Sequence, residues 1–109
     1  MGLNFYGRYF PDLQNPRQAA AILGHEYIKI LGEKVVGSGG VSEDESITMN
    51  SEAKEHFSFF SDPDSGTQSL LIYPSLYSIH LKIELAKKLG VGLSIWEVGQ
   101  GLDYFYDLF

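Results

Sequence analysis

The sequence contains no cysteine, and this absence excludes disulfide bonds, thiolate nucleophiles and zinc–thiolate sites together. It also has no apolar run near the roughly 18 residues that span a bilayer, so no transmembrane helix is expected. Positive charge is scarce, because 8 Lys and Arg residues stand against 14 Asp and Glu, for a net charge of −6. Nucleic-acid-binding proteins need a basic face, which this balance does not favour. We therefore expect no nucleic acid and no membrane among the partners, and no cofactor.

The first residues, MGLNFYGRYF, lack the basic start and the long apolar segment of a signal peptide. A length of 109 residues, with 44% hydrophobic and 20% charged residues, is typical of one small soluble domain. Aromatic residues are frequent at 14%, and many lie near the two ends of the sequence. Aromatic rings build cores first, but they also form surfaces on which sugar rings stack.

The first third of the sequence predicts a strand, a loop and a helix. Leu3 to Tyr6 is a short apolar run typical of a buried strand. Arg8 to Pro16 has no periodicity and carries two prolines, which indicates a loop. Arg17 to Leu31 predicts a helix that ends at Gly32, although Gly24 within the run weakens an unbroken helix.

The middle of the sequence predicts a mobile loop followed by strands. Residues 37–46 are glycine-rich and then acidic, which favours a mobile loop. A short strand is expected over Ser46 to Met49. The runs Glu55 to Phe60 and Gln68 to Tyr73 are separated by turn residues, including Pro and Gly, so a β-hairpin is expected.

The last third predicts a helix, a strand and a short aromatic helix. The first of these opens at Pro74-Ser75, runs to Leu89 and ends at Gly90. Leu93 to Val98 is an apolar strand, and Leu102 to Phe109 forms the final helix. A strand, an insertion, a helix and a second strand make a unit of parallel sheets and barrels. Two parallel strands cannot bury their own faces, so further structure is expected around them.

Several short motifs are better explained by structure than by chemistry. Residues 37–40 lack the Gly-Lys-Ser/Thr of a phosphate loop, so we expect a linker there. Residues 62–66 hint at a calcium loop, but Tyr73 occupies the twelfth position, where a bidentate Glu is required. The acidic residues 42–46 are typical of a solvated loop. The histidines lack ligand spacing, so no shared metal site is expected among them: His25, His56 and His80.

Trp96 is the strongest candidate for a binding residue. It lies near the carboxyl end of the last strand, where open α/β sheets and barrels place their ligands. Strand alternation puts Ser94 and Trp96 on one face, with Leu93, Ile95 and Glu97 on the other. If Leu93 and Ile95 pack on helices, Trp96 points into the interior of a barrel. The alternative is an ordinary core tryptophan.

The segment GLSIWEVGQGLDYFYDL, from Gly92 to Leu108, resembles the end of the glycoside hydrolase family 18 barrel. The opening GLNFYG, from Gly2 to Gly7, is similar to the seventh strand of that family. Three further segments fall in the expected order between the two ends: Gly24–Leu31, Ser51–Phe57 and Tyr73–Ser78. The resemblance covers nearly the whole chain and is greatest to the chitinase-domain-containing subgroup. Residues 33–46 are longer than the usual connection.

The resemblance implies an α/β fold that is the C-terminal part of a (β/α)₈ TIM barrel. Its parts are strand 7, an α+β insertion with a hairpin over about residues 8–74, helix 7, strand 8 and helix 8. A complete barrel takes about 250 residues, so residues 1–109 are expected to be a C-terminal fragment of a family 18-like domain. Strand edges without neighbours predict poor folding cooperativity and self-association of this chain on its own.

The resemblance also implies a sugar site. It assigns Trp96 to the floor of the central sugar subsite and Tyr6 to the same cleft, with Glu97 and Gln100 near its mouth. The catalytic Glu of the family belongs to a D-x-x-D-x-D-x-E motif, which this sequence does not contain. No catalytic residue is therefore assigned, and this chain alone is not expected to hydrolyse sugars.

The function expected from the resemblance is binding of chitin or chitooligosaccharides, with an N-acetylglucosamine-containing oligosaccharide as partner. One alternative is that the chain is part of an active family 18 hydrolase. The second alternative is a stand-alone interaction module that recruits a protein partner. The resemblance further implies a secreted or lysosomal location.

Overall fold

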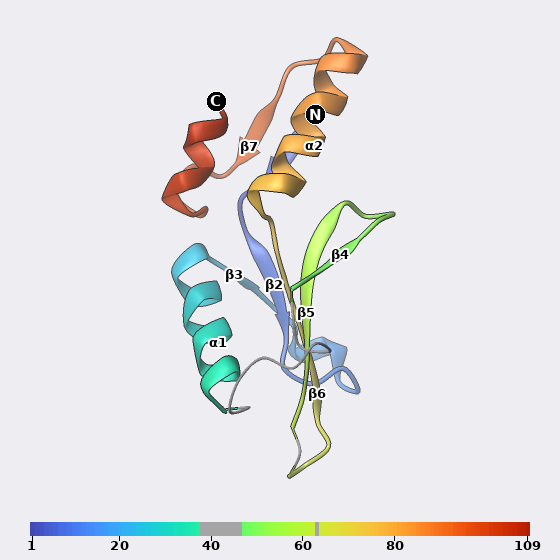
Figure 1. Cartoon of the computed structure of the whole chain (residues 1–109), viewed down its shortest axis with the longest axis vertical. Helices are drawn as coiled ribbons and strands as arrows, with labels where there is room; N and C mark the ends of the chain where they lie inside the picture. The colour runs from blue at the N-terminus through green and yellow to red at the C-terminus, as the bar shows by residue number, and fades with distance from the viewer. Residues whose placement is uncertain (38–46, 63) are drawn as a thin grey trace.

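The computed structural model describes residues 1–37, 47–62 and 64–109, which form two sheets arranged end to end (Figure 1). The molecule is elongated, with extents of 50 × 26 × 26 Å. Its radius of gyration is 15.0 Å, whereas about 13 Å is usual for a compact domain of this length. No helix among the described residues is long and apolar enough to span a membrane.

The first sheet is a parallel pair made by the two ends of the chain. Strand β1 (Gly2–Asn4) pairs with β7 (Ser94–Trp96), and Leu3 lies opposite Ile95. This pairing confirms the expected association of the first and last strands. Helix α2 (Leu76–Leu89) and the 3₁₀ helix η3 (Asp103–Leu108) lie beside the pair (Figure 1). The final helix was expected from its aromatic sequence, and it takes the tighter 3₁₀ form.

The second sheet consists of five antiparallel strands in the order β3-β2-β6-β5-β4. The strands are β2 (Gly7–Phe10), β3 (Ala20–Ile22), β4 (Thr48–Asn50), β5 (Glu55–Ser61) and β6 (Gln68–Tyr73). The β5–β6 hairpin confirms the prediction from the turn residues. Asp62 accepts hydrogen bonds from the backbone of Asp64 and Ser65, and Gly66 has a φ of 71°, as a hairpin turn requires. Strand β4 begins two residues later than the strand expected from Ser46.

The predicted loop over Arg8 to Pro16 is wrong in its first part. Residues Gly7–Phe10 form β2, which pairs with β6 on one side and with β3 on the other. The partners lie far along the sequence, so the local composition does not reveal the strand. The chain leaves the sheet at Pro11, and a short 3₁₀ helix, η1, follows at Pro16–Gln18.

The predicted helix over Arg17 to Leu31 is wrong at both ends. Ala20–Ile22 forms the edge strand β3, because its backbone pairs with β2. Helix α1 spans Gly24–Gly37 and passes through Gly32 without ending there. A glycine inside a helix costs only about 1 kcal/mol, which the rest of the helix tolerates. Of the predicted mobile loop, residues 38–46 lie outside the described residues.

Helix α1 begins at Gly24, where the surrounding space is too crowded for a larger residue. A Cβ atom on Gly24 would lie 3.0 Å from the side chain of Leu102 and 3.1 Å from the hydroxyl of Tyr73. The Gly24 amide also donates a hydrogen bond to the carbonyl of Gln100 at 3.0 Å. The start of α1 is thereby attached to the turn that follows β7.

Helix α2 agrees closely with its prediction. Ser75 caps its N-terminus and forms a reciprocal capping box with Ser78. Gly90 ends the helix in the left-handed conformation with a φ of 66°. Both ends are set by local chemistry, which is why the sequence shows them.

The two sheets are joined by a buried aromatic cluster. Phe5 and Phe105 are fully buried and meet edge to face with ring centroids 5.3 Å apart. Tyr73, at the end of β6, stacks on Phe105 and on Tyr27 of α1. Its hydroxyl lies 2.8 Å from the carbonyl oxygen of Gln100 and 3.1 Å from that of Phe5. Burial raises the pKa of Tyr73 to about 12. Tyr73 therefore connects both sheets with the turn after β7.

Candidate functional site

The chain from β1 into β2 has one buried side and one open side. Leu3, Phe5 and Gly7 are buried, whereas the residues between them, Asn4 and Tyr6, are half-buried. The alternation continues to Arg8, which is exposed. Figure 1 shows the chain passing from β1 into β2 without reversing its direction. Side chains of an extended chain alternate between two faces, so Asn4, Tyr6 and Arg8 share one side of the molecule.

Trp96 lies on this open side, at the carboxyl end of β7. It pairs in register with Asn4, and its carbonyl accepts a hydrogen bond of 2.8 Å from the Phe5 amide. The neighbouring Ile95 points the other way and packs against the hydrophobic core. The Trp96 side chain is 68% exposed, so it does not belong to the hydrophobic core that the described residues form. Among the described residues, nothing buries this face of the parallel pair.

The turn after β7 positions Glu97 and Gln100 next to Trp96. The side-chain oxygen of Gln100 accepts a hydrogen bond of 3.3 Å from the Glu97 amide. The Gln100 amide in turn donates to the Glu97 carbonyl at 3.1 Å. Gly99 has a φ of 101° and donates to the hydroxyl of Tyr106, which closes the turn. The Gln100 side chain therefore stabilises the turn. The Glu97 side chain is exposed.

Tyr6 follows β1 as Trp96 ends β7, so both residues lie at the carboxyl end of the parallel pair. The Tyr6 carbonyl accepts a hydrogen bond of 2.9 Å from the side chain of Asn4. The structure thus brings Trp96, Glu97 and Gln100 into one turn and puts Tyr6 beyond the neighbouring strand. Sequence reasoning missed Asn4 and Arg8. The alternation of residue types from Leu3 onward was the signal that could have revealed them.

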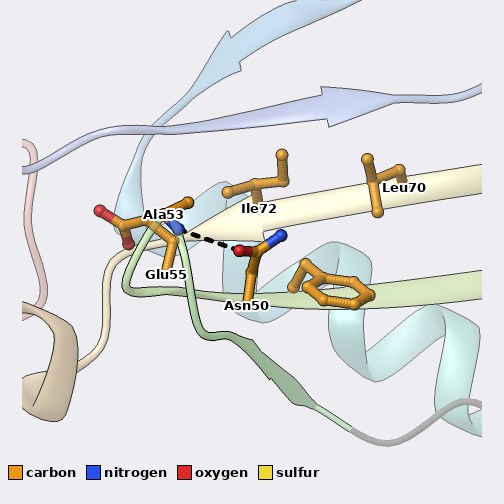
Figure 2. A pocket seen from close by; sticks show the side chains of 6 residues that line it. Asn50, Ala53, Glu55, Leu70 and Ile72 are labelled. Carbon is orange, nitrogen blue, oxygen red and sulfur yellow. Dashed lines mark hydrogen bonds between the residues drawn. The ribbon is translucent and has the colours of Figure 1, made fainter.

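A second feature of the open side is a hollow of about 350 Å³ on the five-stranded sheet (Figure 2). Its walls are mainly apolar, and its lining residues come from β4, β5, β6 and the turn after β4: Asn50, Ala53, Glu55, Phe57, Leu70 and Ile72. Ile72 lies opposite Arg8 on β2 and opposite Phe57 on β5. Helix α1 covers the other face of this sheet through Tyr27, Ile30 and Leu31. The hollow therefore lies on the face that the described helices leave uncovered.

The polar groups around the hollow are largely occupied. The Asn50 side-chain oxygen accepts hydrogen bonds from the amides of Glu52 and Ala53, at 3.0 and 2.9 Å. Figure 2 shows the Glu55 carboxylate directed away from Leu70. This carboxylate forms an ion pair with Lys82 of α2, and burial lowers the pKa of Lys82. The rim of the hollow thus carries a compensated charge pair rather than a free acid.

The three histidines lie on different elements and do not converge. His25 is at the start of α1, His80 is in α2, and His56 of β5 lies 2.5 Å from the Ser75 hydroxyl. Within residues 1–37, 47–62 and 64–109, no group of three His, Asp or Glu side chains could hold a metal ion. The acidic residues 42–46 and most of the glycine-rich residues 37–40 lie outside the described part.

Solved structures with the same arrangement are chitinase-like proteins. The spore cortex-lytic enzyme SleL of Bacillus megaterium matches over 99% of this chain with a TM-score of 0.74 and 22% identity. A chitinase from Chromobacterium violaceum matches over 98%, with a TM-score of 0.74 and 16% identity. The chain has a chitinase-like α/β fold. A chitinase-like agglutinin from Robinia pseudoacacia also matches over 98%, with a TM-score of 0.60 and 20% identity.

The chitinase-like fold of this chain is only part of each matched protein. The chain spans 24% of the Bacillus protein and 30% of each of the other two. No protein-family model matches the sequence. By their names the matched proteins include two enzymes and one agglutinin, and what this chain shares with all three is the fold.

Proposed function

We propose that the chain binds oligosaccharides that contain N-acetylglucosamine, and that Trp96 is the platform on which a sugar ring stacks. The observation that carries this proposal is the 68% exposure of Trp96 on an uncovered sheet face, in a chitinase-like fold. An exposed indole offers a flat apolar surface, and the neighbouring Asn4 and Ser94 provide hydrogen-bonding groups. Tyr6, Glu97 and Gln100 line the same end of the sheet in this proposal.

The proposal includes the architecture around the site. The parallel pair and its helices are strands 7 and 8 and helices 7 and 8 of a (β/α)₈ barrel related to glycoside hydrolase family 18. The insertion covers about residues 8–74, and the subgroup that the sequence resembles is the chitinase-domain-containing one. A barrel would place the face of Asn4 and Trp96 inside, which explains why α2 covers only the opposite face. Secretion follows from the same resemblance.

Binding rather than hydrolysis is proposed for this chain because its sequence contains no D-x-x-D-x-D-x-E motif. The similarity to a chitinase-like agglutinin supports this choice, since that protein is named for agglutination and not for hydrolysis. The similarity to two enzymes leaves catalysis by a larger protein containing this chain as the alternative.

Titration with chitooligosaccharides tests the proposal through the single tryptophan of the sequence. We expect saturable quenching or a shift of Trp96 emission. By calorimetry, Trp96→Ala should weaken binding about tenfold or more, as truncation of a central contact usually does. Trp96→Phe should restore part of the affinity.

Tyr77→Ala is the matched control, because Tyr77 is an exposed aromatic residue of α2 and is not among the residues proposed to line the site. Its affinity should equal that of the unchanged protein. Equal binding by Trp96→Ala and the unchanged protein would remove Trp96 from the site.

A further inference from the structure

The backbone on either side of Trp96 is held by hydrogen bonds. On the strand side, the Trp96 carbonyl accepts a hydrogen bond of 2.8 Å from the Phe5 amide. On the turn side, the Gln100 amide donates to the Glu97 carbonyl at 3.1 Å, and the Glu97 amide donates to the Gln100 side chain at 3.3 Å. A group that fixes both Phe5 and Gln100 therefore fixes the segment that carries the indole.

The Tyr73 hydroxyl reaches both of these residues from the end of β6. It lies 2.8 Å from the Gln100 carbonyl oxygen and 3.1 Å from the Phe5 carbonyl oxygen. A phenol has a single proton to donate, so the two carbonyls share it. Since the Phe5 amide donates to the Trp96 carbonyl, two hydrogen bonds in sequence connect the five-stranded sheet to Trp96.

The ring that carries this hydroxyl is itself fixed. Tyr73 is buried, and its ring stacks on Tyr27 of α1 with centroids 4.5 Å apart and an interplanar angle of 14°. Burial raises the pKa of Tyr73 to about 12, so the hydroxyl keeps its proton near neutral pH and remains a donor. The turn after β7 is also crowded, because a Cβ atom on Gly101 would lie 2.7 Å from the Phe5 ring. Phe5 and Tyr73 therefore hold the turn together.

We propose that Tyr73 is a positioning residue for the sugar platform: its hydroxyl holds the Phe5 and Gln100 carbonyls, and through them it fixes the orientation of Trp96. This inference rests on the proposed function and adds to it a buried residue of the five-stranded sheet that would not contact the sugar. A platform binds more tightly when it is ordered before the ligand arrives, because ordering it during binding costs free energy. Loss of the hydroxyl should therefore loosen Trp96 and weaken binding.

Tyr73→Phe tests the inference, because it keeps the stacked ring and removes only the hydroxyl. The sequence contains a single tryptophan, so one indole N–H resonance reports on Trp96, and its ¹H–¹⁵N nuclear Overhauser effect measures the order of the side chain. In the full chain without ligand, this order should be lower in Tyr73→Phe than in the unchanged protein. Calorimetry with chitotetraose should show about three- to tenfold weaker binding by Tyr73→Phe.

Two control variants separate positioning from a general loss of stability. Tyr27→Phe removes the hydroxyl from the ring that stacks on Tyr73, and that hydroxyl makes no hydrogen bond within the part of the chain that the structure describes. Ile79→Val removes one methyl group from a buried residue of α2 and should lower the melting temperature. Both controls should keep the indole order and the affinity of the unchanged protein.

An unchanged indole order or an unchanged affinity in Tyr73→Phe overturns the inference. Equal losses of order and affinity in Ile79→Val also overturn it, since a loss of stability would then explain both. If the unchanged protein binds chitotetraose in these cases, the proposed function stands. If the unchanged protein does not bind chitotetraose, the proposed function fails, and the indole order of the free variants still shows by itself whether Tyr73 positions Trp96.

Discussion

The two sheets of this molecule are built in different ways. The five-stranded sheet contains the β5–β6 hairpin, whose strands are joined by a short turn and pair from His56–Tyr73 to Ser61–Gln68. The parallel sheet joins only the two ends of the chain, with three register pairs from Gly2–Ser94 to Asn4–Trp96. Hairpins form from local sequence, whereas parallel pairs need a long connection and cover on both faces. The parallel pair is therefore the less complete of the two.

This difference explains where the candidate site lies. The hairpin sheet is covered on one face by α1, and the parallel pair is covered on one face by α2. Their uncovered faces meet along Asn4, Tyr6 and Arg8 because the chain continues from β1 to β2 with its alternation intact. The parallel pair and the five-stranded sheet thus share one accessible side. The polar and aromatic side chains of the candidate site lie on this side.

The largest expected effect comes from breaking the five-stranded sheet at its junction with the parallel pair. A Cβ atom on Gly7 would lie 2.2 Å from the Ile72 carbonyl oxygen and 2.5 Å from the Tyr73 ring. Gly7→Ala should lower the free energy of unfolding by about 3 kcal/mol or more, because backbone and a buried ring must move. Urea denaturation measures this loss.

Gly92→Ala is the control for this substitution, because a Cβ atom there meets nothing within 4 Å. Its stability should change by less than about 0.5 kcal/mol. Similar losses of unfolding free energy in both variants would show that crowding at Gly7 is not the cause of the destabilisation.

A smaller effect is expected from removing the contact that links the two sheets. Tyr73→Phe keeps the ring stacking but leaves the Phe5 carbonyl without its hydroxyl donor. We expect a loss of about 1–2 kcal/mol at neutral pH, as is usual for a buried hydrogen bond left unmade. Denaturation followed by Trp96 fluorescence and by backbone circular dichroism would show whether the two sheets then unfold separately.

The same substitution has a pH signature. Burial raises the pKa of Tyr73 to about 12 from the ordinary tyrosine value of 10.0, so the folded state holds this proton more tightly than the unfolded state. Its stabilising contribution is present below pH 10 and is lost as the pH rises towards 12. Tyr73→Phe should therefore lose less stability than the unchanged protein over this range. Identical alkaline profiles would contradict the burial of this hydroxyl.

The smallest effect should be confined to α1. Gly32 lies inside this helix, and a Cβ atom there meets nothing within 4 Å. Gly32→Ala should raise the free energy of unfolding by about 0.5–1 kcal/mol through the helix propensity of alanine. The emission of Trp96 should not change, since Gly32 lies about two turns beyond Gly24, where α1 is attached to the turn after β7. A shift of that emission would show that α1 influences the parallel pair.

Local chemistry explains which elements could be predicted. The ends of α2 at Ser75 and Gly90, and the hairpin turn around Gly66, depend on capping and turn residues that the sequence shows directly. Strand β2 and the start of α1 could not be predicted in the same way. Arg8 becomes part of a strand because Ile72 pairs with it, and Gly24 is required at the start of α1 because Tyr73 and Leu102 leave no room for a side chain.

Some features of the candidate site could be predicted from the sequence, and others could not. The position of Trp96 near the end of a strand, and the face that it shares with Ser94, follow from strand alternation in the sequence. Its exposure does not follow, because one alternating strand fits a core tryptophan equally well. Arg8 was placed in a loop by its local sequence, so its relation to Ile72 and to the hollow was inaccessible.

The sequence by itself determined the chemistry of this protein: an acidic, cysteine-free chain with a single tryptophan, a capped helix, a hairpin and an apolar strand at each end. These properties depend on residues within one turn or one strand of each other. Only the tertiary structure decided that Trp96 remains exposed and that Arg8 stands beside an apolar hollow. Such relations depend on contacts between residues that are distant in the chain, and pairing over that distance leaves no local pattern to read.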